Sequence, residues 1–253
     1  MKDKRRLLIA IAVTAALIVA ISAFLLFRPI LDGNGDGLLR GLKYTVESGM
    51  AVITEYNGKD AHVTIPAEID GRPVGVIGLE AFMDNTNLVS VTLPDTLVYI
   101  GVSAFSGCKN LNEVTIPGSV ELIGGNAFLN CASLLEIEIP YGVEAIGWSA
   151  FEGCINLKSV LLPDSVASID EYVFRNCRSL TEITVPGSVK TVGAGLFYGC
   201  RKLVSARFNG DKPDLIDPIY KVFYDVDGAF RIYYPRGALN WSSTWDDYPT
   251  EKV

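Results

Sequence analysis

The sequence predicts a solenoid, a coil of stacked turns that each contribute one short strand, preceded by a single transmembrane helix. Three observations support this prediction. The five cysteines are spaced 23 residues apart, an Ile-Gly phrase recurs at the same spacing from position 77, and residues 7–27 form a long apolar run. A repeat of about 20 to 50 residues indicates stacked units. One such unit cannot close a core, but neighbouring units bury continuous ladders of apolar side chains.

Six units follow one consensus, I-G-x-x-A-F-x-x-C-x-x-L-x-x-V-x-L-P-x-x-V-x-x. Phenylalanine recurs at 82, 105, 128, 151, 174 and 197, and proline at 94, 117, 140, 163 and 186. Phrases such as EVTIP and EIEIP alternate with the two-residue period of a strand. Proline ends that strand because it cannot donate a hydrogen bond to a neighbour. The glycine or aspartate after the isoleucine predicts a backbone turn with φ near or above zero, and the Ala-Phe pair places a large ring inside the coil.

The repeat continues in degenerate form at both ends, as is typical of turns that cap an open core. VTIP at 63–66 lies one period plus five residues before the first regular proline, and the excess fits a turn insertion at 70–74, DGRPV. Residues 222–235 match 104–117 position for position, with Val226 in place of cysteine. We therefore expect an N-terminal cap over 44–76, six repeats over 77–213, and a degenerate repeat with an aromatic cap over 214–253.

These units resemble the bacterial BspA-type leucine-rich repeat, over about 175 of the 253 residues. The resemblance implies a right-handed, mainly β leucine-rich repeat solenoid with one short parallel strand per 23-residue turn and short helical or 3-10 turns. It also implies a cell-surface protein that binds host or neighbouring proteins, and it brings no shared catalytic residues.

The N-terminus predicts a membrane anchor. Basic residues within 1–6 precede the apolar run 7–27. As a helix this run would rise about 31 Å, close to the thickness of the hydrocarbon core of a bilayer. The positive-inside rule keeps 1–6 cytoplasmic and exports the rest, with 28–43 as a juxtamembrane linker. The alternative is a cleaved signal peptide with a small-x-small site at Ala20-Ile21-Ser22, which would leave the protein secreted.

The exported part of the chain is acidic. Residues 1–27 hold four of the 22 basic side chains and one of the 29 acidic ones, so 28–253 carries 18 basic and 28 acidic groups, a net charge of −10. Such a surface repels polyanions, which argues against nucleic acid and anionic lipid headgroups as partners.

The regular cysteine spacing predicts packing. The positions are Cys108, Cys131, Cys154, Cys177 and Cys200. Equivalent residues of stacked turns lie about 4.8 Å apart, so these side chains form one line inside the coil. Buried cysteine behaves as a small hydrophobe, and Asn85 takes the same place in the first unit. We expect buried free thiols. One or two disulfides are the alternative, and a line of thiolates does not converge on a metal ion.

Outward positions of the strands predict a binding surface. Its acidic members are Glu113, Glu136, Glu138 and Glu182. The first three fall on adjacent turns and would suit a basic partner, although a solvated face is the plainer interpretation. A catalytic carboxylate pair of Glu136 and Glu138 is the least favoured interpretation.

The C-terminal segment 220–248 is crowded with aromatic residues. A cap core accounts for most of them, and a ligand platform of Tyr233, Trp241 and Trp245 is the alternative. The turns carry a basic strip, interpreted as solvated or as a contact for an acidic protein or polysaccharide. Its members are Arg175, Arg178, Arg201 and Lys202.

Two further features carry little chemistry. The loop DGNGDG at 32–37 resembles a calcium loop, but Arg40 and Lys43 stand where ligands are required, so we expect a stalk. The single histidine, His62, has no catalytic motif around it.

Together these features predict a non-catalytic, membrane-anchored cell-surface binding protein of the adhesin or receptor type. Its expected partner is an extracellular protein or glycan, and no cofactor is expected. The alternative is a structural or assembly scaffold of a membrane complex. The sequence leaves the oligomeric state open.

Overall fold

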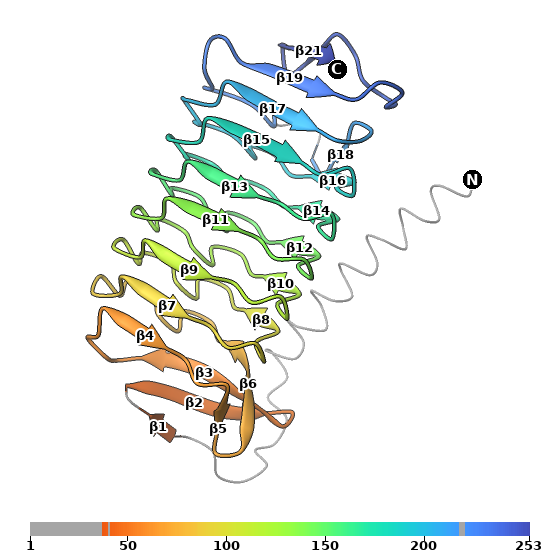
Figure 1. The fold of residues 1–253 in the computed structure, drawn as a ribbon. Helices are drawn as coiled ribbons and strands as arrows, with labels where there is room; N and C mark the ends of the chain where they lie inside the picture. Colours follow the sequence, from red (N-terminus) through yellow and green to blue (C-terminus); the bar gives the residue numbers. More distant parts are fainter. Residues whose placement is uncertain (1–36, 40, 218–220) are drawn as a thin grey trace. The chain divides into compact units, whose positions relative to one another are not determined.

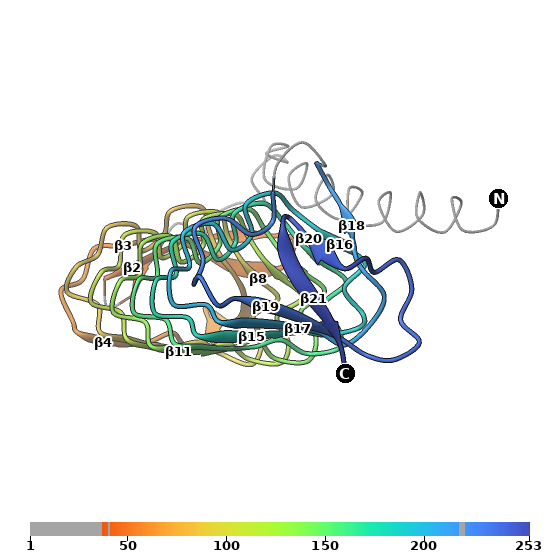
Figure 2. The ribbon, with the colours of Figure 1, turned by 90° about the horizontal axis from the view of Figure 1, so that it is seen from above.

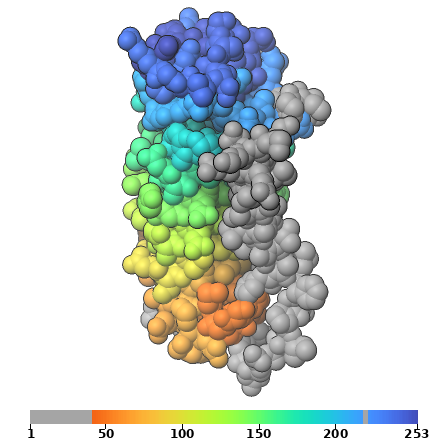
Figure 3. Space-filling view, turned by 90° about the vertical axis from the view of Figure 1, so that its right-hand side faces the viewer, coloured from red at the N-terminus to blue at the C-terminus, as the bar shows by residue number. Residues whose placement is uncertain are grey.

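The computed structural model describes residues 37–39, 41–217 and 221–253. Within this part every regular element is a strand, and most strands lie in two rows that follow the stack of turns (Figure 1). The turns are stacked in sequence order, as the bands of colour from orange to blue show (Figure 3). The predicted segments 1–6 and 7–27 and most of the linker 28–43 fall outside the described residues. No helix in the described part is long and apolar enough to cross a membrane.

The first row holds the strands that the EVTIP-like phrases predict. It comprises β4 (His62–Thr64), β7 (Ser90–Thr92), β9 (Glu113–Thr115), β11 (Glu136–Glu138), β13 (Ser159–Leu161), β15 (Glu182–Val185), β17 (Ser205–Phe208), β19 (Arg231–Tyr234) and β21 (Tyr248–Lys252). Neighbouring strands pair in parallel and in repeat register, as with Val63 and Val91. The pairing is interrupted between β9 and β11 and between β13 and β15, although these strands remain in contact.

The second row corrects the expectation of one strand per turn. It comprises β6 (Arg72–Ile77), β8 (Tyr99–Ile100), β10 (Leu122–Ile123), β12 (Ala145–Ile146), β14 (Ser168–Ile169), β16 (Thr191–Val192) and β18 (Asp214–Leu215). Each pairs in parallel with the next, as with Ile100 and Ile123. The view from above shows β16 and β18 on the side of the coil away from β15 and β17 (Figure 2). Because two residues cannot show strand alternation, the sequence concealed this row.

The third segment of each turn, around the Ala-Phe pair, is a run of tight turns and not the short helix that the family resemblance implied. Its amides donate to the next turn of the coil. The N–H of Phe82 donates to the carbonyl oxygen of Ala104 at 2.8 Å, and the N–H of Asp84 donates to that of Ser106 at 2.7 Å. A helix would direct these amides to its own carbonyls four residues back. Hydrogen bonds therefore join successive turns on all three sides of the coil.

The glycine after each isoleucine has a different role from the one predicted. The left-handed residues come two positions later, with φ of 56° at Ser103 and Asn126. The glycine itself is required by close approach of the turns. A Cβ on Gly101 would lie 2.5 Å from the carbonyl oxygen of Ile77, and a Cβ on Gly124 would lie 2.8 Å from the carbonyl carbon of Gly101. The prediction of φ near or above zero at the glycine itself was therefore wrong, because the left-handed residue comes two positions later. Glycine is required at its own position because a Cβ there would collide with the preceding turn.

A column of stacked rings fills the core. It comprises Tyr56, Phe82, Phe105, Phe128, Phe151, Phe174, Phe197 and Phe223. Successive ring centroids are 4.9 to 5.8 Å apart, and the planes are inclined by 3° to 27°. The phenylalanines are at most 1% exposed. Tyr56 comes from the N-terminal cap and Phe223 from the degenerate repeat, so both irregular ends extend the column.

The cysteines form a second buried column of free thiols. Each Sγ–H donates to the carbonyl oxygen of the phenylalanine in the preceding turn, at 3.0 to 3.3 Å. Burial raises the pKa of Cys108, Cys154 and Cys200 to about 12. Burial likewise holds the pKa of Cys131 and Cys177 well above the ordinary thiol range. All five are therefore protonated at neutral pH, and the S–H donor gives cysteine a role beyond packing.

Antiparallel strands begin the described part of the chain. They are β1 (Gly37–Leu39), β2 (Leu42–Glu47) and β3 (Met50–Tyr56), of which β3 pairs in parallel with β6. β1 and the start of β2 lie within the range 28–43 that was expected to be a linker. The insertion at 70–74 is a hairpin between β5 (Glu68–Ile69) and β6. Its turn residues Asp70 and Gly71 have φ of 51° and 69°, typical of a two-residue hairpin loop.

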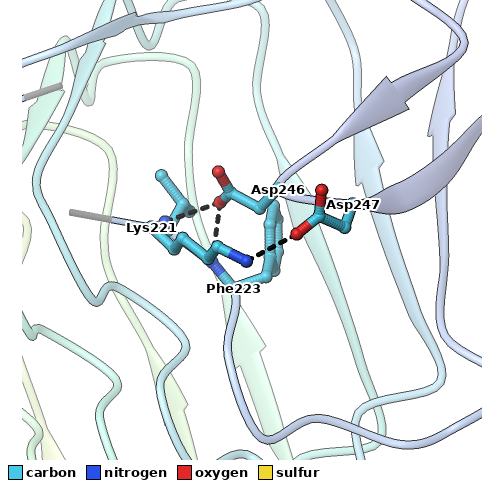
Figure 4. Close-up of polar contacts among 5 residues, drawn as sticks. Lys221, Phe223, Asp246 and Asp247 are labelled. Carbon is cyan, nitrogen blue, oxygen red and sulfur yellow. Dashed lines mark hydrogen bonds and ion pairs between the residues drawn. The ribbon is translucent and has the colours of Figure 1, made fainter. Parts of the chain in front are cut away.

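The other end is closed by a hairpin of β20 (Thr244–Trp245) and β21. In the turn before, the N–H of Phe197 donates to the carbonyl oxygen of Val222 at 3.0 Å. No further turn covers this segment among the described residues, and Asp246 Oδ2 accepts the N–H groups of Val222 at 2.6 Å and Phe223 at 3.0 Å (Figure 4). At Phe223 the carboxylate thus takes the place that the carbonyl oxygen of the next turn has at Phe197. Asp246 is half-buried, and this burial raises the pKa of its carboxyl group.

Candidate binding surface

The first row of strands presents an outward set of side chains that the core does not constrain. On β11 Ile137 is buried, while Glu136 and Glu138 are exposed. On β9 Glu113 is exposed at the position equivalent to Glu136. Since neighbouring rungs are about 4.8 Å apart, these three predicted carboxylates form one cluster. Glu182 of β15 is also exposed, but the rung of β13 lies between it and this cluster.

A shallow hollow of about 530 Å³ lies beside this acidic cluster, over the starts of β9, β11 and β13. Its lining consists of Asn112, Glu113, Leu135, Glu136, Lys158 and Ser159. Leu135 is 47% exposed and lies between polar neighbours. The hollow therefore combines two carboxylates, the ammonium group of Lys158 and an accessible apolar side chain. Glu138 does not line it, so the hollow does not bring together the carboxylates of the least favoured, catalytic interpretation.

The predicted aromatic platform is divided between core and surface. Trp245 is 4% exposed and packs against Phe208 and Phe223 at centroid distances of 5.2 and 5.4 Å. Trp241 stacks on Tyr234 at 4.8 Å and donates Nε1–H to the carbonyl oxygen of Gly210 at 3.1 Å. These contacts support the cap interpretation for both tryptophans. We therefore leave Trp245 out of any proposed binding surface.

Tyr233, the third member of that platform, lies on the first row. The guanidinium of Arg207 lies 5.5 Å from the centre of its ring. This pair occupies neighbouring rungs, because Arg207 pairs in register with Tyr233. Tyr233 is therefore available to a ligand of the strand face, although far along the row from the acidic cluster.

The basic strip is partly neutralised by ion pairs. Arg175 Nη1 lies 3.4 Å from Glu152 Oε1, and Arg201 Nε lies 2.8 Å from Asp225 Oδ2. Arg178 and Lys202 are exposed. The sequence analysis missed the aromatic partners of Arg175, which are Tyr172 and Tyr198. A signal was present, since tyrosine at 172 departs from the Glu, Ser, Asn and Gly that the other regular units carry there.

The remaining candidates from the sequence are His62, a metal site and the calcium-like loop. His62 is exposed on β4, with Nδ1 2.8 Å from Ser90 Oγ. No group of three His, Cys, Asp or Glu side chains is arranged to hold a metal ion among the residues that the structure describes. The calcium-like loop lies outside the described residues except for Gly37, the first residue of β1.

Comparison with known proteins identifies the repeat. Residues 75–209, more than half of the chain, match the BspA type leucine rich repeat region in six copies. The chain belongs to the BspA type leucine-rich repeat family. Members of this kind are in general non-catalytic binding scaffolds, and in this member the turns on either side of 75–209 are the irregular ones that close the core.

Two solved structures are similar to this BspA-type chain. The leucine rich repeat protein TpLRR of T. pallidum has 34% sequence identity and a TM-score of 0.65, with 69% of this chain and 86% of that chain covered. A leucine rich cell surface protein of Faecalibacterium prausnitzii A2-165 has 25% identity and a TM-score of 0.54, with 81% of this chain and 71% of that chain covered. No curated protein matches the chain significantly.

Proposed function

We propose that this BspA-type protein is a non-catalytic cell-surface receptor or adhesin that recognises an extracellular protein through its first row of strands. The observation that carries the proposal is the hollow over the rungs of β9, β11 and β13, with Glu113 and Glu136 in its lining. Because the inward residues of each strand already complete the core, the outward residues are free to serve recognition.

The chemistry of the hollow favours a basic partner. Leu135 of the lining is 47% exposed. Outside the hollow, on the same row of strands, Leu161 of β13 is 62% exposed and pairs in register with Glu138. A lysine or arginine side chain could pack its stem on such apolar groups while its charged head reaches a carboxylate. The partner is therefore proposed to present basic residues beside apolar ones.

We also propose that residues 7–27 anchor the protein in the plasma membrane with the repeats outside. The support is the length of the apolar run and the basic residues that precede it. A cell-surface location is also the one stated for the relative from F. prausnitzii.

The test is binding by the full chain in detergent micelles to a panel of extracellular matrix and bacterial surface proteins. For a bound protein, we expect reversal of two charges (Glu113→Lys with Glu136→Lys) to weaken binding about tenfold or more, because buried charge pairs at interfaces contribute strongly. Glu182→Lys, the same change outside the hollow, is the matched control and should have little effect. Equal effects of both variants would refute the proposed site. If no protein on the panel binds, the scaffold role is favoured instead.

A further inference from the structure

A second cluster lies on the turn segments, away from the first row of strands. We name it the tyrosine–arginine column, and it consists of Tyr172, Arg175, Tyr198 and Tyr224. The guanidinium carbon of Arg175 lies 5.3 Å from the ring centre of Tyr172 and 5.1 Å from that of Tyr198. Tyr198 in turn stacks on Tyr224 at 5.2 Å with planes inclined by 23°. One cation is therefore held between two rings, and a third ring extends the stack.

The backbone at Tyr172 has a strained conformation, and this conformation places the ring in the column. Its φ is 58°, in the left-handed region that bulky residues avoid. Equivalent positions in other units carry residues better suited to it, such as Asn126 and Gly195. One turn further on, a Cβ on Gly195 would lie 2.4 Å from Cε1 of Tyr172, so only glycine leaves room for the ring. Strain of this kind clusters at functional sites, and here it places an aromatic ring against Arg175.

The polar partners of Arg175 leave it with unused donors. Among the described residues its ion pair is with Glu152, long at 3.4 Å, and Glu152 also accepts the hydroxyl hydrogen of Ser149 at 2.7 Å. Nε of Arg175 is buried without a hydrogen-bond partner and is closed to a ligand, whereas the side chain as a whole is 39% exposed, so the donors that a ligand can reach are those at the Nη1 and Nη2 end of the guanidinium. Glu152, whose carboxylate accepts a hydrogen bond from Ser149, therefore orients the guanidinium group but leaves some of its N–H donors without a partner.

A stack of this kind presents edges, not faces, to a ligand. The edge of a guanidinium carries N–H donors in a fork that matches a carboxylate, and the edge of a tyrosine carries a hydroxyl that donates and accepts. Tyr198 and Tyr224 are 37% and 51% exposed, so their edges are accessible. The column thus offers one cationic fork beside a short line of hydroxyl groups.

We propose that the tyrosine–arginine column is a binding site for a carboxylated sugar, such as one hexuronate unit of an acidic polysaccharide. The sugar carboxylate pairs with the guanidinium edge of Arg175, and the ring hydroxyls exchange hydrogen bonds with the hydroxyls of Tyr198 and Tyr224. The net charge of −10 on the part after residue 27 opposes ligands with many closely spaced negative charges, so the proposed pairing is between one carboxylate and the one cation of the column. This site goes beyond the proposed strand-face function, because it uses different residues on another side of the coil.

The experiment measures binding of trigalacturonate to the full chain in detergent micelles by saturation-transfer NMR titration. Its methyl ester is the matched ligand, which differs by one methyl group on each carboxylate and carries no charge. We expect the ester to bind about tenfold more weakly or not at all, because the charge-assisted pair with Arg175 is lost. Equal binding of the acid and the ester would overturn the proposal, as would absence of binding by trigalacturonate. Tighter binding of pentaglutamate than of trigalacturonate would assign the site to acidic peptides instead.

Variants locate the site. Arg175→Gln should weaken trigalacturonate binding about tenfold, and Arg175→Lys should also weaken it, because lysine keeps the charge but lacks the flat fork. Arg178→Gln removes an exposed arginine of the same strip and should leave binding unchanged. Tyr224→Leu, which alters a half-exposed ring, provides a second variant with little risk to the fold and should weaken binding severalfold by removing a hydroxyl partner.

Unchanged binding in Arg175→Gln, or an equal loss in Arg178→Gln, contradicts the assignment. The charge-reversal variant of Glu113 and Glu136 should bind trigalacturonate normally, which separates this test from that of the strand face.

Discussion

Asp246 closes the hydrogen-bonded end of the coil, and its removal should destabilise the protein. Its Oδ2 accepts two backbone N–H groups at 2.6 and 3.0 Å, from Val222 and Phe223. A hydrogen bond to a charged group stabilises a protein by about 1.5–3 kcal/mol, and part of this is offset because the carboxylate loses water. We expect Asp246→Ala to lower the free energy of unfolding by about 2–4 kcal/mol. Asp246→Asn keeps a carbonyl oxygen as the acceptor and should lower it by about 1 kcal/mol or less.

The neighbouring aspartate is a matched control for this substitution. Asp247 also lies in the left-handed region, with φ of 71° against 53° at Asp246, so alanine at either position meets similar backbone strain. The side chain of Asp247 is 87% exposed, and within the described residues its ion pair is with the exposed Lys221. Exposed ion pairs contribute about 0–1 kcal/mol. The difference between Asp246→Ala and Asp247→Ala therefore reports the two hydrogen bonds to the backbone.

The pH dependence gives a second measurement. Burial raises the pKa of Asp246 in the folded protein above its ordinary value. A raised pKa means that the folded state binds the proton more tightly than the unfolded chain does, so this group favours folding most below its ordinary pKa. That contribution is lost as pH rises through the folded pKa. The stability of wild type relative to Asp246→Asn should therefore fall with rising pH across the acidic range and level off above it.

Urea unfolding followed by tryptophan fluorescence measures these effects, because Trp241 and Trp245 both lie in the C-terminal cap. The reasoning is refuted if Asp247→Ala destabilises the protein as much as Asp246→Ala. It is also refuted if Asp246→Ala changes the free energy of unfolding by less than about 0.5 kcal/mol, the range of ordinary surface substitutions.

Two further predictions concern the regular repeats. The five cysteines are buried thiols with raised pKa, so iodoacetamide should label none in the native protein and all five after denaturation without reductant; fewer than five would reveal disulfides. Gly124→Ala places a Cβ 2.8 Å from the backbone of Gly101, whereas Gly228 has no atom within 4 Å of such a Cβ. Differential scanning calorimetry should show a loss of about 2 kcal/mol or more for Gly124→Ala and a change within about 0.5 kcal/mol for Gly228→Ala. Equal effects would contradict close approach as the reason for the glycine.

The fold class, the buried columns and the first row of strands could all be predicted from the sequence. Alternation in phrases such as EVTIP involves residues close together in the chain, and the fixed spacing of phenylalanine and cysteine is a periodicity of the sequence, so neither requires knowledge of the contacts between turns. The acidic cluster was also predictable, because Glu113 and Glu136 occupy one position of adjacent repeats.

The features that depend on contact between turns could not be predicted from the sequence. Each of these features involves residues of neighbouring turns. They are the second row of strands, the close approach at Gly101, the hydrogen bond from each thiol to a phenylalanine carbonyl oxygen, and the hollow beside Leu135. Asp246 and Val222 are likewise 24 residues apart in the chain. Arg175 meets the ring of Tyr198 for the same reason, across one turn of the coil. The repeat places such residues on neighbouring rungs, but the direction of each side chain and the space around it are set by packing, which the order of residues does not state.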